Sequence, residues 1–328
     1  MADAVRTALA LVLVAGCATP TPPQEPAQPP PVAAPRTASD MAVEPVEPVA
    51  PVELVVAKPD PTCGADHLCN GESCCTKLDV PAGSYPDKRA GKVDVGAFRL
   101  DKYELTVGRV RAWLEAGRPT PHDGAVIGMD SSGRPVTWSG AWRTQSAEHL
   151  QGWARYDTWS AGDPALPKNF IDWYTSAAVC AYAGGRLPTD AEWRYVAVGG
   201  EEDRPFPWGA DAQTPDRAVF NCSGDGNPSC SLADILPVGS RPLGAGRWGH
   251  MDLAGSMFEW TLDAGGSEAT VSRGGGFCYI GGIDRRAKKA DTVANIRRDA
   301  PTTTSHMVGA RCAFDVPGGG PGHALASR

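Results

Sequence analysis

The sequence has no excess of basic residues: 31 Lys and Arg stand against 38 Asp and Glu, which gives a formal net charge of −7. A protein that binds a polynucleotide needs a positive surface field to attract phosphates, so we expect no nucleic acid partner. Aromatic residues are only 7% and charged residues only 21% of the 328 residues. The distribution of these residues along the chain therefore indicates which part folds.

The stretch from residue 17 to residue 61 is almost without aromatic side chains and consists mainly of Pro, Ala, Val and Glu. Such a composition cannot bury enough apolar surface to offset the entropy lost on ordering, and its prolines favour extended polyproline II structure. We expect a tether without specific partners. At about 3.1 Å per residue its reach is at most on the order of 100 Å.

The first apolar run is too short to span a bilayer. It extends from Ala8 to Val14, follows a single Arg6 and ends before Cys17, which is typical of a signal peptide over residues 1–16. The small residues before Cys17 predict a lipoprotein signal, with Cys17 lipidated and the protein exported and held on a membrane by its lipid anchor. Ala18 favours the outer membrane. The alternative is an ordinary signal peptide that is cleaved elsewhere.

Ten cysteines in an exported chain predict disulfides, because the envelope outside the cytoplasm is oxidising. With Cys17 lipidated, an odd number remains, so at least one thiol is unpaired or shared between molecules. Residues 62–75 contain four of the cysteines, in CGADHLCNGESCC. Adjacent cysteines are poor zinc ligands, so this segment favours disulfides over a zinc site, with the pairing left open: Cys63, Cys69, Cys74 and Cys75.

The folded part is predicted over residues 76–316, followed by a flexible Gly-rich tail over 317–328. Apolar alternation predicts a strand over 96–103, and Thr106 is expected to cap a helix that follows it. A second helix is expected over 176–183. Thr189 and Glu192 form a T-x-x-E capping box at the start of a third. These short elements predict an α+β domain with much irregular backbone.

Seven sequence blocks stand out along the folded part. In chain order they are FRLDKYELTV (98–107), GGRLPTDAEWRY (184–195), PFPWG (205–209), PVGS (237–240), GHMDLAGSMFEWTLD (249–263), VSRGGGF (271–277) and VGARCAF (308–314). Together they resemble the sulfatase-modifying factor family, which includes the formylglycine-generating enzymes. The family's fold is the C-type-lectin-like variant with little regular secondary structure, and the resemblance implies that fold here. The segments SCC, VPAGSY and GRWGHMDLAGS look most like the lipoprotein branch found in myxobacteria.

The resemblance also indicates where catalysis should occur. Family members that make formylglycine bind Cu(I) with two thiolates, five positions apart, shortly after the glycine-rich block. Alignment on Arg273 places Tyr279 and Asp284 at these positions, and a shift by one residue brings Cys278 onto the first but Ile283 onto the second. Oxygen donors do not suit a soft ion such as Cu(I). We therefore expect no copper and no catalytic residue that acts by the family mechanism.

The resemblance implies a disulfide between Cys180 and Cys312. Cys222 and Cys230 flank the short segment SGDGNPS and are expected to pair locally. Cys278 is then the odd thiol. Two interpretations of it stay open: a buried thiol or disulfide partner without chemistry, which we favour, and a reactive nucleophile.

A calcium site carries over from the family to the segment MDLAGSMFE. Its ligands here are the side chain of Asp252, the carbonyls of Gly255 and Met257, and the side chain of Glu259. Hard oxygen donors suit Ca²⁺. The alternative is that the two carboxylates only cap the loop by hydrogen bonds. The resemblance implies a second calcium site, with the Asn221 side chain and the Cys222 carbonyl as expected ligands and Asp234 as a candidate third.

Three functions follow from these observations. The first, which we favour, is a non-catalytic envelope module that presents a groove to a peptide, a glycan or another envelope protein. The second is a formylglycine-generating oxidase, or a related protein-modifying enzyme, with an altered site around Cys278, Tyr279 and Asp284. The third is a purely structural lipoprotein.

Overall fold

The computed structural model describes residues 59–64, 67–88, 90–151, 155–227, 229–263, 269–278 and 296–316. The chain divides into the units Met1–Val56 and Ala57–Arg328, and every described residue belongs to the second. The predicted signal peptide, Cys17, most of the tether and the tail over 317–328 lie outside the described residues. None of the helices in the described part is long and apolar enough to cross a bilayer.

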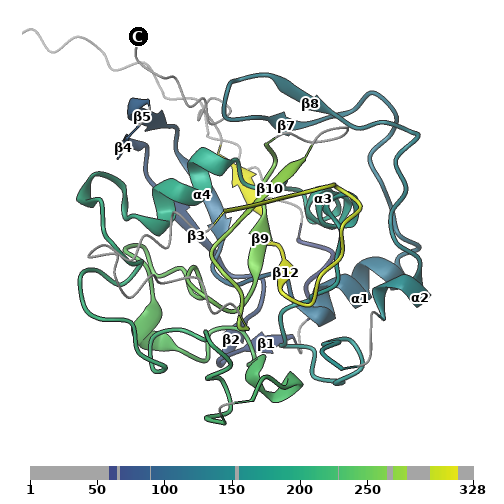
Figure 1. The fold of residues 1–328 in the computed structure, drawn as a ribbon. Helices are drawn as coiled ribbons and strands as arrows, with labels where there is room; N and C mark the ends of the chain where they lie inside the picture. Colours follow the sequence, from purple (N-terminus) through teal and green to yellow (C-terminus); the bar gives the residue numbers. More distant parts are fainter. Residues whose placement is uncertain are drawn as a thin grey trace, which may run out of the picture. The chain divides into compact units, whose positions relative to one another are not determined.

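Regular elements are short, and irregular segments join them (Figure 1). The helices are α1 (Val107–Glu115), α2 (Ala147–Leu150), α3 (Trp173–Tyr182) and α4 (Asp190–Ala197), with 3-10 turns at Gly200–Glu202, Leu232–Asp234 and Pro242–Gly244. The strands are β1 (Leu68–Cys69), β2 (Glu72–Ser73), β3 (Lys77–Val80), β4 (Gly83–Asp87), β5 (Gly91–Val95), β6 (Phe98–Asp101), β7 (Val126–Met129), β8 (Pro135–Thr137), β9 (Phe258–Trp260), β10 (Thr270–Arg273), β11 (Ile296–Asp299), β12 (Val308–Gly309) and β13 (Ala313–Asp315). The predicted α+β class is confirmed.

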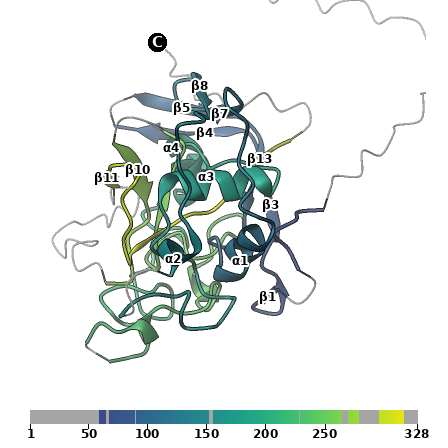
Figure 2. The same ribbon diagram turned by 90° about the vertical axis from the view of Figure 1, so that its right-hand side faces the viewer.

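Two small sheets organise the domain. One has the order β11-β10-β9-β12, with β9 and β12 parallel and the other pairs antiparallel. The other is antiparallel, in the order β13-β6-β3. Figure 1 shows the first sheet at the centre, flanked by α3 and α4. Figure 2 places β10 and β11 on the side opposite to β3 and β13, with α3 between them in that view.

The helices begin where side chains satisfy their first backbone N–H groups. Thr106 accepts from the backbone of Arg109 at the start of α1, and Thr189 and Glu192 form the predicted capping box of α4. The prediction that the middle helix starts at residue 176 was wrong. The Asp172 side chain accepts from the backbone N–H of Thr175, so α3 begins three residues earlier.

Tryptophans and disulfides hold the core together. Trp113, Trp173, Trp193 and Trp260 are fully buried, and each contributes a large apolar area. The structure pairs Cys180 with Cys312, which joins α3 to the segment before β13. In the Cys-rich segment the pairs are Cys63 with Cys75 and Cys69 with Cys74.

Candidate functional site

The loop before β9 has an unusual backbone. Asp252, Gly255 and Ser256 all have positive φ, at 59°, 80° and 54°. A Cβ on Gly255 would lie 2.1 Å from the carbonyl oxygen of Val219, so only glycine fits there. Non-glycine residues in the left-handed region cost free energy and persist where the surrounding structure holds them. The loop is therefore a constrained element and not a simple connection.

Three carboxylates gather beside this loop. Glu104 and Glu259 are fully buried. Glu104 accepts hydrogen bonds from the Ser256 hydroxyl, at 2.8 Å, and from the Met257 backbone N–H, at 3.0 Å. Asp252 accepts from a backbone N–H of the neighbouring PVGS segment. Sequence analysis named Asp252 and Glu259 but missed Glu104.

The only guanidinium that pairs with these carboxylates among the described residues is Arg311. It donates to both oxygens of Glu259, at 2.6 Å each, and one of those oxygens also accepts from Trp193 Nε1, at 2.8 Å. Sequence analysis missed Arg311, although an Arg within the apolar block VGARCAF signals a buried charge, which needs a partner.

The carboxylates outnumber the cation, and their titration reflects this. Burial raises the pKa of Glu104 well above its usual value, and the nearby carboxylates of Asp252 and Glu259 add to the effect. Burial also raises the pKa of Asp252 to about 6, with Glu259 adding to it. One guanidinium ion pair balances only one of the three carboxylates, and the raised pKa values reflect the cost of ionising the other two without a further cation. Carboxylate oxygens that have too few cationic partners suit a divalent cation such as Ca²⁺.

The second predicted calcium site lies on a neighbouring loop. Asn221 and Cys222 are consecutive residues with positive φ, at 50° and 56°. The oxygens of Asp234 accept backbone N–H groups of Gly224, at 2.9 Å, and Ser231, at 2.8 Å. Asp234 therefore closes this loop by hydrogen bonds, and the calcium assignment of Asn221 and Cys222 stays a prediction.

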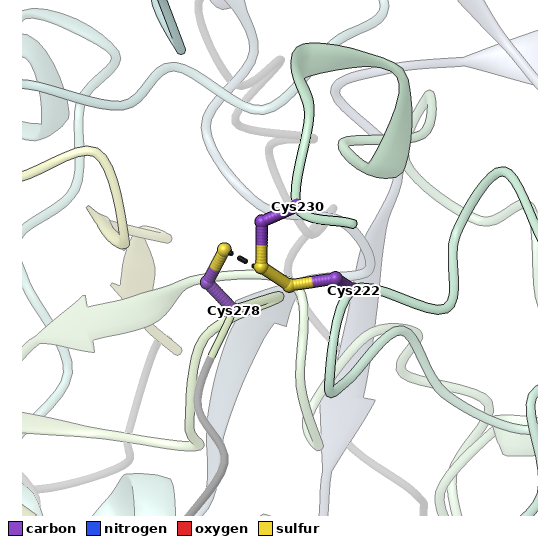
Figure 3. A group of neighbouring side chains, drawn as sticks. All are labelled: Cys222, Cys230 and Cys278. Carbon is purple, nitrogen blue, oxygen red and sulfur yellow. Dashed lines mark hydrogen bonds between the residues drawn. A yellow bond between two sulfur atoms is a disulfide. The ribbon is translucent and has the colours of Figure 1, made fainter. Parts of the chain in front are cut away.

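A group of three sulfurs lies at the end of the glycine-rich block (Figure 3). Cys222 and Cys230 form a disulfide, and the free thiol of Cys278 lies with its Sγ 3.2 Å from Sγ of Cys222. All three sulfurs are within 4.8 Å of one another. Burial raises the pKa of the Cys278 thiol, and the Asp234 carboxylate adds to it, while Arg155 opposes it. Tyr279 and Asp284 lie outside the described residues.

An open groove lies between the segment 143–149 and the segment 302–304. Its volume is about 720 Å³, within the range of ligand sites. The lining mixes both signs of charge with hydroxyl and amide groups, and it includes Arg143, Gln145, Glu148, His149, Phe170 and Asp172. Sequence analysis did not identify this groove, because its walls come from three distant parts of the chain.

Comparisons with known proteins identify the family of this domain. Residues 70–316 match the sulfatase-modifying factor enzyme 1-like domain. The formylglycine-generating enzyme of Streptomyces coelicolor is 28% identical, over 84% of this chain and 97% of its own. The inactive C-alpha-formylglycine-generating enzyme 2 of Mus musculus is 32% identical, over 45% of this chain and 49% of its own.

The crystal structure of CarF shares the fold. It covers 74% of this chain and 99% of its own, with a TM-score of 0.51 and 16% identity. The predicted C-type-lectin-like fold is thereby confirmed. The chain belongs to the sulfatase-modifying factor family of formylglycine-generating-enzyme-like proteins.

Proposed function

We propose that this chain is a non-catalytic binding module of an exported lipoprotein. One observation carries the proposal: Tyr279 and Asp284 stand where active family members have their two copper thiolates. The neighbouring Cys278 supplies no substitute pair, because its sulfur lies against a cysteine that is already in a disulfide. A soft monovalent ion needs sulfur donors, and copper is therefore not part of the proposal.

A relative supports this proposal. The Mus musculus protein that matches 45% of the chain is described as inactive, so the family contains a member described without the activity.

The same proposal includes the tether, the lipidated Cys17 and the outer-membrane location, since a domain on a long flexible tether can reach a partner away from the membrane. Replacing Cys17 by Ser (Cys17→Ser) should abolish palmitate labelling in cells and release the protein from the membrane fraction.

The groove beside α2 offers a surface for a peptide or glycan of an envelope partner. Its charged and amide groups present both donors and acceptors, as polar ligands require.

In this proposal Ca²⁺ is structural, held by Asp252, Glu259 and the carbonyls of Gly255 and Met257. When bound, it would supply positive charge beside the buried carboxylates, and Glu104 would keep the loop in place through Ser256 and Met257.

The decisive experiment combines copper titration with oxygen uptake. The full chain is titrated with Cu(I) and then given a peptide with the cysteine motif of a sulfatase and a reductant, with the Streptomyces coelicolor enzyme as positive control. We expect no oxygen uptake above the protein-free blank. A double variant, Tyr279→Cys with Asp284→Cys, should gain tight Cu(I) binding. Copper-dependent turnover by the unaltered chain would overturn the proposal.

The second candidate is an oxidase with an altered site, and the three neighbouring sulfurs favour it. The same assay tests it. If the unaltered chain turned over the peptide and Cys278→Ser abolished that turnover, the altered-site enzyme would replace the binding module.

A further inference from the structure

The three-sulfur group of Cys222, Cys230 and Cys278 has a defined order of burial. Cys222 is 3% exposed, whereas Cys230 and Cys278 are half-buried. The Cys222 backbone N–H donates to the Phe277 carbonyl, at 2.8 Å, which holds Cys222 beside Cys278. The Cys222 sulfur is thus shielded from outside thiols but lies 3.2 Å from a thiol of its own chain.

We propose that these three cysteines form a thiol–disulfide exchange site in which Cys222 is the shared partner. The Cys278 thiolate attacks Sγ of Cys222. A Cys222–Cys278 bond forms as the Cys222–Cys230 bond breaks, and Cys230 leaves as a thiolate that takes up the proton Cys278 has lost. The numbers of disulfides and thiols do not change, so the step needs neither oxidant nor reductant. The free thiol moves from residue 278 to residue 230.

The loop around Cys230 is held by contacts other than the disulfide. Asp234 accepts backbone N–H groups at both ends of it, from Gly224 and Ser231. The Tyr156 hydroxyl donates to the Cys230 carbonyl, at 3.3 Å. Opening of the Cys222–Cys230 bond therefore leaves the loop folded, and Cys230 stays within reach for the reverse step.

The two pairings also constrain the chain differently. The Cys222–Cys230 disulfide closes a segment of 8 residues, whereas a Cys222–Cys278 disulfide would join residues 56 positions apart. A crosslink over a longer segment removes more entropy from the unfolded chain, so the exchanged form should resist unfolding more strongly. This inference is independent of whether the domain binds a partner or acts as an enzyme.

The test counts and locates free thiols. Full-length protein with Cys17→Ser has nine cysteines, of which eight form four disulfides and one is free. The protein is held at pH 8, quenched in acid, alkylated and digested without reduction for mass spectrometry. Exchange predicts two populations, one alkylated at Cys278 and one alkylated at Cys230 with a Cys222–Cys278 disulfide. Alkylation at Cys278 alone would overturn the proposal.

A second variant keeps the test decisive. Cys230→Ser forces Cys222 to choose another partner, so on refolding with oxidised glutathione as the oxidant the free-thiol count should fall from one to zero as Cys222 and Cys278 pair. Two free thiols, at Cys222 and Cys278, would contradict the shared-partner geometry. The matched control is Cys278→Ser, in which Cys222 should pair with Cys230 alone. In all variants an intact Cys180–Cys312 disulfide reports that the domain has folded.

Discussion

Arg311 and Glu259 form a bidentate ion pair, and both side chains are fully buried. The Arg311 Nε and Nη2 atoms each lie 2.6 Å from a Glu259 carboxylate oxygen. Arg311 also donates to the carbonyls of Asp101, Lys102 and Met251. It therefore joins β9 to the end of β6 and to the start of the positive-φ loop. The pair is therefore one of the contacts that link the two sheets, and it lies beside that loop.

Replacing Arg311 by Met should be strongly destabilising. The substitution keeps much of the volume but leaves the Glu259 carboxylate buried and unpaired, next to Glu104 and Asp252. Breaking a buried pair in this way costs about 3 to 5 kcal/mol. Urea denaturation should measure a loss in this range.

The matched control for this substitution is Arg217→Met. Arg217 pairs with Asp211 at the surface, where the Asp211 side chain is 72% exposed, and such pairs contribute less than about 1 kcal/mol. If the two substitutions had equal effects, the buried pair would not be the link described above.

Local capping signals predicted the starts of α1 and α4 but not that of α3, and the buried site depended on distant residues. The Thr189–Glu192 capping box needs only a spacing of three and was correct. Glu104 lies about 150 positions from the loop it supports, so no local pattern identifies it. The pairing in the Cys-rich segment was equally open, because four close cysteines allow three arrangements. The family resemblance named the loop, but only the structure shows that Arg311 and Trp193 already engage Glu259.

Asp172 should make stability depend on pH below neutrality. Burial raises the pKa of this helix cap to about 6, against an unfolded value of 3.8. A raised carboxyl pKa stabilises the folded state fully below pH 3.8, and that contribution is lost as the pH rises through 6. At 1.36 kcal/mol per pKa unit the loss is at most about 3 kcal/mol.

Asp172→Asn tests this effect, because Asn caps a helix as well as Asp does and does not titrate. The difference in unfolding free energy between unaltered protein and variant, measured from pH 4 to pH 7, should shift in favour of the variant as the pH rises. A difference that stayed constant over this range would show that the Asp172 pKa is not raised.

The Cys180–Cys312 disulfide should contribute far more than a short one. It closes a segment of 132 residues, whereas Cys69–Cys74 closes one of 5. The chain-entropy relation gives about 5 kcal/mol for the first and about 2 kcal/mol for the second. Paired Cys→Ala substitutions, compared by thermal and urea unfolding, should preserve this order. A larger loss from the Cys69–Cys74 pair would mean that native contacts, and not the unfolded chain, determine the effect.

Calcium should stabilise the folded domain through the carboxylates beside the positive-φ loop. Ca²⁺ would relieve the repulsion between Glu104, Asp252 and Glu259, and a ligand at one hundred times its Kd stabilises by about 2.7 kcal/mol. Added Ca²⁺ should therefore raise the melting temperature of chelator-treated protein. Asp252→Asn should remove this increase, and in the absence of Ca²⁺ should unfold no more easily than the unaltered chain, since one of the three neighbouring negative charges is gone. In the control variant Asp211→Asn, at an exposed carboxylate, Ca²⁺ should raise the melting temperature as much as in the unaltered chain. An equal calcium response in the Asp252 variant would show that the two carboxylates only cap the loop.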